Sequence, residues 1–482
     1  MKLDSNRIVF VVANRTDDLY DKYPINTFCW IPPQFPLGCG YLAAVLEQEG
    51  FEVIVMDNYL NKKPPINVAI DIISKNARYV GLSANTLTIN NVLDIARAVK
   101  NIDKRIITIL GGPHASLFSE RMIAEQDIDF VITGEGEYVL RGLLRDLRSA
   151  KCEMPRVSNK VFHAKRMDNL DELPFPARHL FEFYSYNRTA EVLSECPADM
   201  LASSRGCPFS CAFCSSAVLW KRIYRKRSPS SVVDEIEFMI EHFGSRAVYF
   251  REDNFSVDRR HVEGICEAIL DRGISIPWEC ESRVDTLTKP LIERMARAGC
   301  KSMWFGIESG SPRILKAIKK GITPGQAKNV FRWCKEVGIE AGAMFMLGFP
   351  NETVEDIYQT KELALGLEAK TTGFATYVGF PKSEMYTHCL ENKLYEARYG
   401  DILIARNENF SFEELLKLEK YLDRAIYLKK YDKRFSSFVS FTRWVPHAIY
   451  SLVFKGQRWQ RTLNFLRMLH EIKCFGKGLL RK

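Results

Sequence analysis

Over the first 148 residues, short runs of hydrophobic residues alternate with segments whose apolar positions recur every three or four residues. Such runs predict buried strands, and the periodic segments predict amphipathic helices. The predicted strands cover residues 7–14, 51–57, 77–84, 105–112 and 128–136. The predicted helices cover residues 40–50, 66–76, 90–100, 116–126 and 137–148. These alternations indicate an α/β fold with a doubly wound parallel sheet of the flavodoxin or Rossmann type.

The same alternation resumes after residue 230. Strands are predicted at residues 247–250, 276–281, 302–307, 340–347 and 372–378. Helices are predicted at residues 231–243, 258–272, 289–298, 324–337 and 353–367. Together with the segment ahead of the first of these helices, the count reaches six β/α units. Several of the strands end in acidic or hydroxyl residues, which indicates a polar ligand at the carboxyl ends of the strands.

These patterns divide the chain into four parts. Residues 1–148 form the doubly wound domain, and residues 201–390 form the second β/α series. Between them, residues 149–200 read as a linker whose extended, proline-bounded segment 169–178 is expected to dock the two domains. Residues 391–482 are expected to form a helical, basic C-terminal region.

Composition and charge add information chiefly about the C-terminal region. The 482-residue chain is 46% hydrophobic and 26% charged, which fits a folded globular protein, and its 13 cysteines fit a reducing compartment. The first residues contain no secretory leader, so a cytoplasmic location is expected. The net charge is +9, but residues 429–482 hold 13 Lys and Arg against 2 Asp and Glu, and the rest of the chain holds 55 against 57.

The basic C-terminal region mixes aromatic, aliphatic and arginine residues at helix-like spacing over residues 435–454 and 459–472, interrupted by Pro446 and Gly456. No run there reaches the length that an apolar membrane span requires. Two interpretations remain open. The segment either packs over the second domain or its partner domain, or it attaches residues 429–482 peripherally to an anionic membrane.

Three cysteines provide the strongest chemical signal. Cys207, Cys211 and Cys214 are separated by three and then two residues in a turn-rich segment, so their thiolates can converge on one centre. Thiolates are soft ligands that suit iron and sulfide. Three of them hold three corners of a [4Fe-4S] cluster and leave the fourth iron open to a small molecule. A zinc site is the alternative, but structural zinc sites usually have four ligands in paired C-x2-C elements, and no second pair follows.

This cysteine spacing, with Phe213 before the last cysteine, resembles the signature of the radical S-adenosylmethionine (SAM) superfamily. The resemblance implies that the open iron chelates the amino and carboxylate groups of SAM. The doubly wound domain precedes the cysteines, and the sequence PLGCGYLAA (residues 36–44) opens its first helix. Over about residues 5 to 390 the chain therefore resembles the cobalamin-binding radical SAM family, with class B methyltransferases as the nearest type. The resemblance implies that the six β/α units form an open (β/α)6 partial TIM barrel.

The resemblance and the strand ends together imply a cobalamin site in the first domain. Ligands of doubly wound sheets bind at the carboxyl ends of the strands. His114 follows the glycine pair and is expected to contact the dimethylbenzimidazole tail or to cap a helix rather than to ligate cobalt. Residues 14–20, where many cobalamin domains carry an axial histidine, contain none. Either cobalamin binds without a histidine ligand, as the resemblance implies, or the domain has lost cobalamin. The other expected cobalamin-binding residues are Ser83, Gly111, Gly112, Glu135 and Gly136.

The resemblance also implies the residues that bind SAM. Glu252 takes the place of the motif that receives the methionyl amine. Glu308 and Ser309 match the Gly-x-Glu-Ser-Gly element at the ribose or methionyl group, and Arg283 is expected to pair with the SAM carboxylate in a bidentate fork. Phe213, within the cysteine motif, completes this set.

A basic and aromatic segment at residues 220–228 follows the cysteines. A charge run of this kind is usually a solvated face. In the cobalamin-binding radical SAM family, which this chain resembles, a matching segment follows the cluster loop. Tyr224 and Arg225 are therefore candidates for contact with the substrate or with the amides of the corrinoid.

The implied function is that of a radical SAM enzyme. The reduced cluster would cleave SAM to a 5'-deoxyadenosyl radical, and cobalamin would serve methyl transfer to an unactivated carbon. The alternative is a radical enzyme on the same scaffold that catalyses a cyclisation, dehydration, deoxygenation or rearrangement. A third hypothesis is that the protein is an iron-sulfur or corrinoid carrier. A tRNA methylthiotransferase fits less well, since that family uses three further cysteines and a small C-terminal β-barrel. We expect a small-molecule or lipid-like substrate, an external electron donor such as flavodoxin or ferredoxin, and no nucleic-acid partner.

Overall fold

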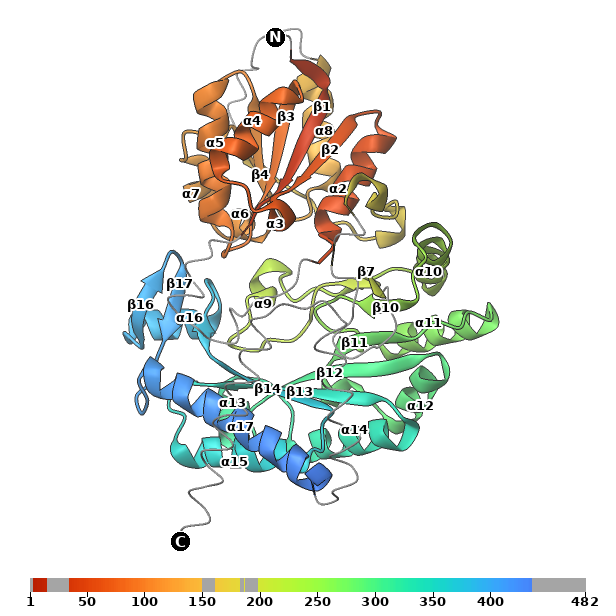
Figure 1. Ribbon diagram of the computed structural model, residues 1–482, viewed down its shortest axis with the longest axis vertical. Helices are drawn as coiled ribbons and strands as arrows, with labels where there is room; N and C mark the ends of the chain where they lie inside the picture. Colours follow the sequence, from red (N-terminus) through yellow and green to blue (C-terminus); the bar gives the residue numbers. More distant parts are fainter. Residues whose placement is uncertain (1–2, 15–33, 150–160, 183–185, 187–197, 436–482) are drawn as a thin grey trace. The chain divides into compact units, whose positions relative to one another are not determined.

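The computed structural model describes residues 3–14, 34–149, 161–182, 186 and 198–435 (Figure 1). Residues 1–422 form one compact unit, and a second unit begins at Asp423. The predictions for the C-terminal region beyond residue 435 lie outside the described residues. Among the described residues, no helix is both long enough and apolar enough to cross a membrane.

The first domain contains a six-stranded parallel sheet in the order β2-β1-β3-β4-β5-β6. All five predicted strands are present. A sixth short strand, β6, lies in the segment that the sequence assigned to the linker, and it pairs in parallel with β5. The strands are β1 (Asp4–Val12), β2 (Glu52–Asp57), β3 (Ala77–Ser83), β4 (Ile107–Gly111), β5 (Phe130–Thr133) and β6 (Val161–His163).

Helices cover both faces of this sheet, as a doubly wound fold requires (Figure 1). Side chains of α4 and α5 pack with one face, and side chains of α2 and α8 pack with the other. The single helix predicted at residues 116–126 is instead two short helices, α6 and α7, which meet at Phe118. The helices are α2 (Leu37–Gln48), α3 (Asn58–Asn61), α4 (Pro65–Ser74), α5 (Ile89–Ile102), α6 (Pro113–Leu117), α7 (Ser119–Ile123) and α8 (Glu137–Ser149).

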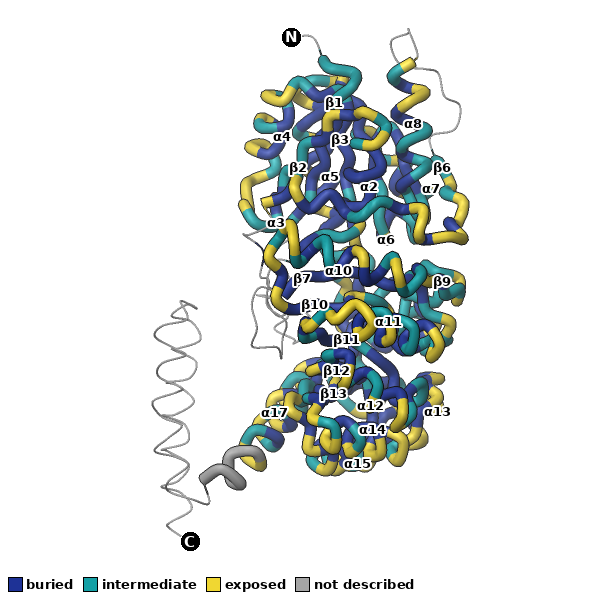
Figure 2. Tube along the Cα trace, turned by 90° about the vertical axis from the view of Figure 1, so that its right-hand side faces the viewer, coloured by how far each residue is buried: buried dark blue, intermediate teal, exposed yellow. Residues whose placement is uncertain are grey.

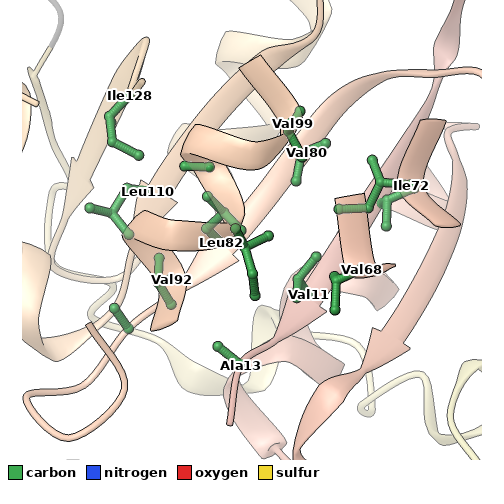
Figure 3. Packing of buried hydrophobic residues seen from close by; sticks show 14 of the residues in the cluster. Val11, Ala13, Val68, Ile72, Val80, Leu82, Val92, Val99, Leu110 and Ile128 are labelled. Carbon is green, nitrogen blue, oxygen red and sulfur yellow. The ribbon is translucent and has the colours of Figure 1, made fainter. Parts of the chain in front are cut away.

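The larger core of this domain lies between the sheet and helices α4 and α5 (Figure 3). Val11, Val80 and Leu110 come from three neighbouring strands, and Ile72 and Val99 reach them from α4 and α5. All five side chains are fully buried. This packing keeps the carboxyl ends of β1, β3 and β4 in a fixed arrangement at one edge of the sheet.

The second domain contains six parallel strands in the order β14-β13-β12-β11-β10-β7. Consecutive strands are neighbours throughout, and the sheet does not close, so the domain is the open (β/α)6 partial barrel that the resemblance implied. The strands are β7 (Ala198–Leu201), β10 (Ala247–Phe250), β11 (Trp278–Ser282), β12 (Cys300–Glu308), β13 (Glu340–Leu347) and β14 (Thr371–Thr376). The main helices are α10 (Pro229–Phe243), α11 (Arg259–Asp271), α12 (Lys289–Arg297), α14 (Pro324–Val337) and α15 (Val354–Gly366). In Figure 2 the strands are buried and the outer faces of these helices are exposed.

Local signals in the sequence account for the ends of these helices. The side chain of Thr323 accepts a hydrogen bond from the backbone of Gln326 and completes a capping box at the start of α14. The same helix ends at Gly338, whose left-handed backbone (φ +79°) suits glycine. Helix α10 likewise begins after Ser228, which caps it, and ends at Gly244. After each of these C-terminal glycines the chain continues into the next strand of the barrel.

The region from residue 391 onward is not purely helical as the sequence predicted. Strands β16 (Tyr395–Tyr399) and β17 (Ile402–Ala405) form an antiparallel hairpin, and β15 (Val378–Gly379) pairs with β17. A helix, α16 (Glu384–Glu391), lies between β15 and β16 in sequence, and α17 (Phe412–Phe435) follows the hairpin. The apolar run Ile402–Ala405 is completely buried. The prediction failed there because a short buried run fits a strand as well as a helix.

Candidate functional site

A cavity of about 700 Å³ lies between the carboxyl ends of the strands of the first domain and the mouth of the partial barrel. Strands β3, β4 and β5 end on its first-domain side, and β7, β10 and β11 end on its barrel side. The wall of the first domain is largely apolar and glycine-rich. The barrel wall carries charged and hydroxyl side chains. The candidate cobalamin residues and the two ends of the cysteine loop, at Arg205 and Ser216, thus face one space.

Five of the six residues predicted to bind cobalamin line this cavity. They are Ser83, Gly111, Gly112, Glu135 and Gly136. Gly112 has a left-handed backbone with φ +94°, and a Cβ atom added there would lie 2.7 Å from the carbonyl oxygen of Ala84. This position therefore excludes other residues and leaves bare backbone facing the cavity.

The apolar part of the first-domain wall also fits a bulky aromatic ligand. The residues that provide it are Phe10, Leu42, Leu82, Ile109 and Ile132. A Cβ atom added at Gly81, which also lines the cavity, would lie 2.5 Å from the ring of Phe10. A flat heterocycle such as the dimethylbenzimidazole tail of cobalamin suits a wall of this composition.

His114 does not line this cavity. Its side chain is fully buried in α6, with Nδ1 3.4 Å from Thr86 Oγ1 and Nε2 3.0 Å from Arg121 Nη2. Because an arginine only donates, Nε2 is the accepting nitrogen. Burial, opposed by Asp401 and reinforced by Arg121, lowers the pKa of His114 to about 4. The neutral imidazole supports the ion pair of Arg121 with Asp401 in the β16–β17 turn, and its predicted contact with the cobalamin tail gains no support from the cavity.

The three cysteines lie between β8 (Ser204–Arg205) and α9 (Ser216–Leu219). All three thiols are free and partly exposed. Just before Cys207, Gly206 has φ +89°, and a Cβ atom there would lie 2.1 Å from the carbonyl oxygen of Ile223. Only glycine therefore allows the chain to turn into the cysteine segment at this point.

Backbone hydrogen bonds tie the cysteine segment to the barrel. The N–H of Ala212 donates to the carbonyl oxygen of Ile318 at 2.9 Å, and its carbonyl oxygen accepts from Met385 at 2.9 Å. In the described part of the chain, no three His, Cys, Asp or Glu side chains are placed to hold a single metal ion. A [4Fe-4S] cluster takes one thiolate per iron, so its ligands stand farther apart than those of one zinc ion. The three thiols of the cysteine loop are free and partly exposed, so they are accessible to such a cluster.

Arg283 is oriented differently from the sequence-based expectation. Its guanidinium lies 3.3 Å from Cys211 Sγ through Nη1 and forms an ion pair with Asp285 at 2.8 Å. It also donates to the carbonyl oxygen of Lys320 and covers the ring of Phe209 at 3.8 Å. Arg283 thus supports the cysteine loop in this arrangement, and its predicted fork to the SAM carboxylate stays a prediction.

Glu252 lies at the end of β10 and lines the cavity. Its carboxylate accepts a hydrogen bond from the backbone N–H of Ser203 at 2.6 Å and another from the hydroxyl of Ser204. Desolvation outweighs these two donors and raises the pKa of Glu252 to about 7. A hydrogen-bond donor on a ligand would favour the ionised form of Glu252, which suits the predicted role at the methionyl amine.

Glu308 and Phe213 lie together at a second point of the barrel mouth. Glu308, with φ +66°, pairs with Lys320 at 2.9 Å, and the ammonium of Lys320 lies 5.8 Å from the centre of the Phe213 ring. Ser309, in contrast, is fully buried and contacts Thr360 on α15. Glu308 is thus placed toward the cysteine loop and Ser309 toward the helical layer.

The catalytic candidates Tyr224 and Arg225 do not line the cavity. Arg225 lies in β9 (Arg225–Lys226), is almost fully buried, and donates to Glu135 Oε2 at 2.6 Å and to the carbonyl oxygen of Met167. Its cation therefore joins the barrel domain to the first domain. Tyr224 is partly buried next to it. Their predicted contact with the substrate gains no support from this arrangement.

Sequence reasoning missed three charged residues of this region: Arg205, Glu137 and Lys320. Arg205 donates to Glu135 at 2.9 Å and to Glu137 at 2.7 Å. Arg205 directly precedes the Gly206–Cys207 pair, and Glu137 follows the Gly134–Gly136 element, so their positions beside recognised motifs were the available signals.

Two family models match the chain. The model of the radical SAM superfamily matches residues 201–364, and the model of the B12 binding domain matches residues 33–144. The two matches coincide with the barrel and with the doubly wound domain.

Sequence similarity to curated relatives extends over most of the chain. A protein of Pyrococcus horikoshii named as a methyltransferase is 29% identical over 82% of this chain and 88% of its own. Cytidylyl-2-hydroxyethylphosphonate methyltransferase of Streptomyces wedmorensis is 25% identical over 81% and 85%. The anaerobic magnesium-protoporphyrin IX monomethyl ester cyclase of Rubrivivax gelatinosus is 26% identical over 73% and 65%.

Among solved structures, the cobalamin-dependent SAM radical enzyme OxsB, with aqua-cobalamin and SAM bound, shares the fold. The comparison gives a TM-score of 0.67 at 17% identity and covers 96% of this chain and 75% of that one. At this identity the likeness shows the fold alone. It extends over both domains.

Proposed function

We propose that this chain, which belongs to the radical SAM superfamily and carries a B12-binding domain, is a cobalamin-dependent methyltransferase acting on an unactivated carbon. The observation that carries the proposal is the shared cavity. Glu252 lies on the barrel side of this space together with Arg205 and Ser216, which flank the cysteine loop in the chain, and the glycine-rich strand ends lie on the other side. Methyltransferases among the relatives support the same reaction.

The side chains present fit the three cofactors of such an enzyme. Cys207, Cys211 and Cys214 would hold a [4Fe-4S] cluster and leave one iron for SAM. Ser83, Gly111, Gly112, Glu135 and Gly136 would receive cobalamin. When bound, the cluster and SAM supply a 5'-deoxyadenosyl radical, and cobalamin supplies a methyl group.

The remaining task of the protein is to hold SAM and to exclude water. Glu252 would accept a hydrogen bond from the methionyl amine of SAM, and a hydrogen bond donated to the ionised form lowers the pKa of the carboxyl group. Glu308, held by Lys320, would contact the ribose or methionyl part of SAM from the same mouth. Arg283 would keep Cys211 in place. Apolar residues of the first-domain wall would shield the radical from water.

A radical cyclase is the second candidate, because an anaerobic cyclase is among the relatives at 26% identity. The two reactions share the cluster, SAM and the barrel. They differ in the fate of the methyl group of SAM, since methyl transfer leaves S-adenosylhomocysteine and cyclisation does not.

The substrate of this reaction is a small molecule, and an external electron donor such as flavodoxin or ferredoxin would reduce the cluster. A lipid-like substrate reached by peripheral membrane contact through residues 429–482, and a cytoplasmic location, stay predictions. The segment beyond residue 435 lies outside the described residues.

Cobalamin-dependent formation of S-adenosylhomocysteine tests this proposal. The protein is reconstituted anaerobically with iron and sulfide, incubated with SAM and reductant, and assayed with and without cobalamin. Methyl transfer predicts S-adenosylhomocysteine only when cobalamin is present. 5'-Deoxyadenosine without any S-adenosylhomocysteine under both conditions would favour the cyclase alternative.

A further inference from the structure

Four charged residues join the two domains beside the cysteine loop. We call Arg205, Arg225, Glu135 and Glu137 the interdomain ion network. Arg205 forks between the two carboxylates, with Nη1 2.9 Å from Glu135 Oε1 and Nη2 2.7 Å from Glu137 Oε1. Arg225 donates to the other oxygen of Glu135 at 2.6 Å. No side chain of the network is more than 14% exposed.

The short hairpin of β8 and β9 places two arginines opposite each other, and their charges need the carboxylates of this network. Strands β8 and β9 are antiparallel, and Arg205 lies directly opposite Arg225. Two like charges in such a pair repel each other unless opposite charges compensate them. Glu135 and Glu137 of the first domain supply the two compensating charges. The cysteine loop begins at Cys207, two residues after Arg205, and is therefore fixed to the first domain by charge.

Arg205 and Glu135 of the network line the cavity, and so does Glu137. This residue is the first of α8, lines the cavity, and is only 5% exposed. Its Oε1 accepts from Arg205, but its Oε2 has no hydrogen-bond partner within the described part of the chain. A buried carboxylate oxygen without a donor is unfavourable, so an unpaired one beside a cavity indicates a donor on the ligand.

We propose that Glu137 is a positioning residue that links the occupant of the cavity to the cysteine loop. One of its oxygens holds Arg205, and the other accepts a hydrogen bond from an N–H group of the occupant. This inference rests on the proposed function, in which cobalamin occupies the first-domain side of the cavity. The primary amides on the rim of the corrin ring are donors of the required kind. Cobalamin binding and the position of the cysteine loop are thereby coupled, and the coupling acts in both directions.

The Glu137→Gln variant tests the link. It keeps the volume of the side chain, but one oxygen becomes an amide nitrogen, which donates a hydrogen bond instead of accepting one. Glu52→Gln is the matched control, because Glu52 lies in the same domain and pairs with Arg7 on the exposed surface. The dissociation constant of hydroxocobalamin is measured by equilibrium dialysis on cluster-reconstituted wild type and both variants.

We expect Glu137→Gln to weaken cobalamin binding at least tenfold and Glu52→Gln to stay within twofold of the wild type. A second readout is the electron paramagnetic resonance spectrum of the reduced cluster. Cobalamin added at a concentration that saturates each protein should change this spectrum in the wild type and leave it unchanged in Glu137→Gln. A purely structural role for Glu137 would not produce this difference between the spectra.

Arg205→Lys is the second variant and leaves Glu137 itself intact. Lysine keeps the positive charge but cannot fork between two carboxylates. We expect it to weaken cobalamin binding at least threefold and to remove the same spectral response. Suppose that the wild type binds cobalamin, and that both variants bind it as tightly and show the same spectral response as the wild type. This result would overturn the inference and leave the proposed function standing. Failure of the wild type to bind cobalamin would overturn the proposed function as well.

Discussion

The guanidinium of Arg283 lies 3.3 Å from the sulfur of Cys211. The ion pair with Asp285 and the carbonyl oxygen of Lys320 hold the guanidinium in that position. A positively charged donor next to a cluster ligand stabilises the more negative, reduced state of the cluster, and so raises its reduction potential.

We therefore predict that Arg283→Gln lowers the reduction potential of the [4Fe-4S] cluster by about 60 mV, a tenfold change in a one-electron equilibrium. The measurement is a redox titration followed by electron paramagnetic resonance. Arg259→Gln is the control, because Arg259 is exposed on α11 and pairs with Glu263. A potential in Arg283→Gln equal to that of the control would contradict a role of Arg283 at the cluster.

SAM binding should depend on pH through Glu252. Because desolvation raises the pKa of Glu252 to about 7, the free carboxyl group is largely protonated below that pH and ionised above it. The N–H group of the methionyl amine requires the ionised, accepting form of Glu252, so SAM affinity should rise as the pH increases from 6 to 8. Isothermal titration with cluster-loaded protein measures the affinity. Glu252→Gln should bind SAM about tenfold more weakly at pH 8 and show no rise with pH, since the loss of one charge-assisted hydrogen bond costs about 1.5 kcal/mol. A parallel rise in wild type and variant would exclude Glu252 as the titrating group.

The cobalamin side of the cavity can be tested at Gly112. The added Cβ atom of Gly112→Ala would lie 2.7 Å from the carbonyl oxygen of Ala84, and φ at this position is +94°. We expect a loss of about 1–3 kcal/mol in the free energy of unfolding from the strained backbone. Bound cobalamin, measured from the absorption spectrum, should decrease strongly while the cluster absorbance is retained.

Gly142→Ala is the control for that variant. Gly142 lies within α8, and no atom lies within 4 Å of the Cβ position there. Alanine should stabilise the helix by about 0.5–1 kcal/mol and leave cobalamin binding unchanged. If both variants retained cobalamin equally, the glycine-rich strand ends would not form its site.

The linker is held by a fully buried ion pair. Arg178 donates to Glu235 at 2.6 Å and to the carbonyl oxygen of Met200 at 2.8 Å, and both charged side chains are inaccessible to solvent. Arg178→Met leaves Glu235 with Arg227 as its remaining cationic partner. We expect a loss of about 3–5 kcal/mol in the free energy of unfolding, the usual cost of breaking a buried pair on one side.

Urea denaturation measures this effect. Arg259→Met, which removes an exposed pair within one helix, should change the free energy of unfolding by only about 0.5 kcal/mol. A similarly small change for Arg178→Met would show that the buried pair does not anchor the linker.

The sequence predicted much of the fold because the strands are bounded by clear changes in pattern. The predicted residues 247–250 and 340–347 coincide with β10 and β13. Strand β6, with only three residues, is too short to give a periodic signal, and its pairing with β5 is a long-range contact. The β16–β17 hairpin was mistaken for part of a helical region because its buried run shows no alternation.

Positions within the site were easier to predict than orientations. A motif gives the place of a residue in the chain, but the neighbours that orient its side chain come from distant segments. Arg283 turns toward Cys211 because of Asp285 and the carbonyl oxygen of Lys320, and Ser309 turns toward Thr360. The pairing of Arg205 with Glu137 joins residues 68 positions apart and could not be predicted from either motif.

The central claim is that the three cysteines support radical cleavage of SAM at the cavity that both domains share. Its most direct test is mass-spectrometric detection of 5'-deoxyadenosine after anaerobic reconstitution and reduction with dithionite, in the wild type and in a variant with Cys207, Cys211 and Cys214 all replaced by alanine. We predict 5'-deoxyadenosine from the wild type and none from the variant. A wild-type protein with full cluster absorbance and bound SAM that forms no 5'-deoxyadenosine would contradict the claim.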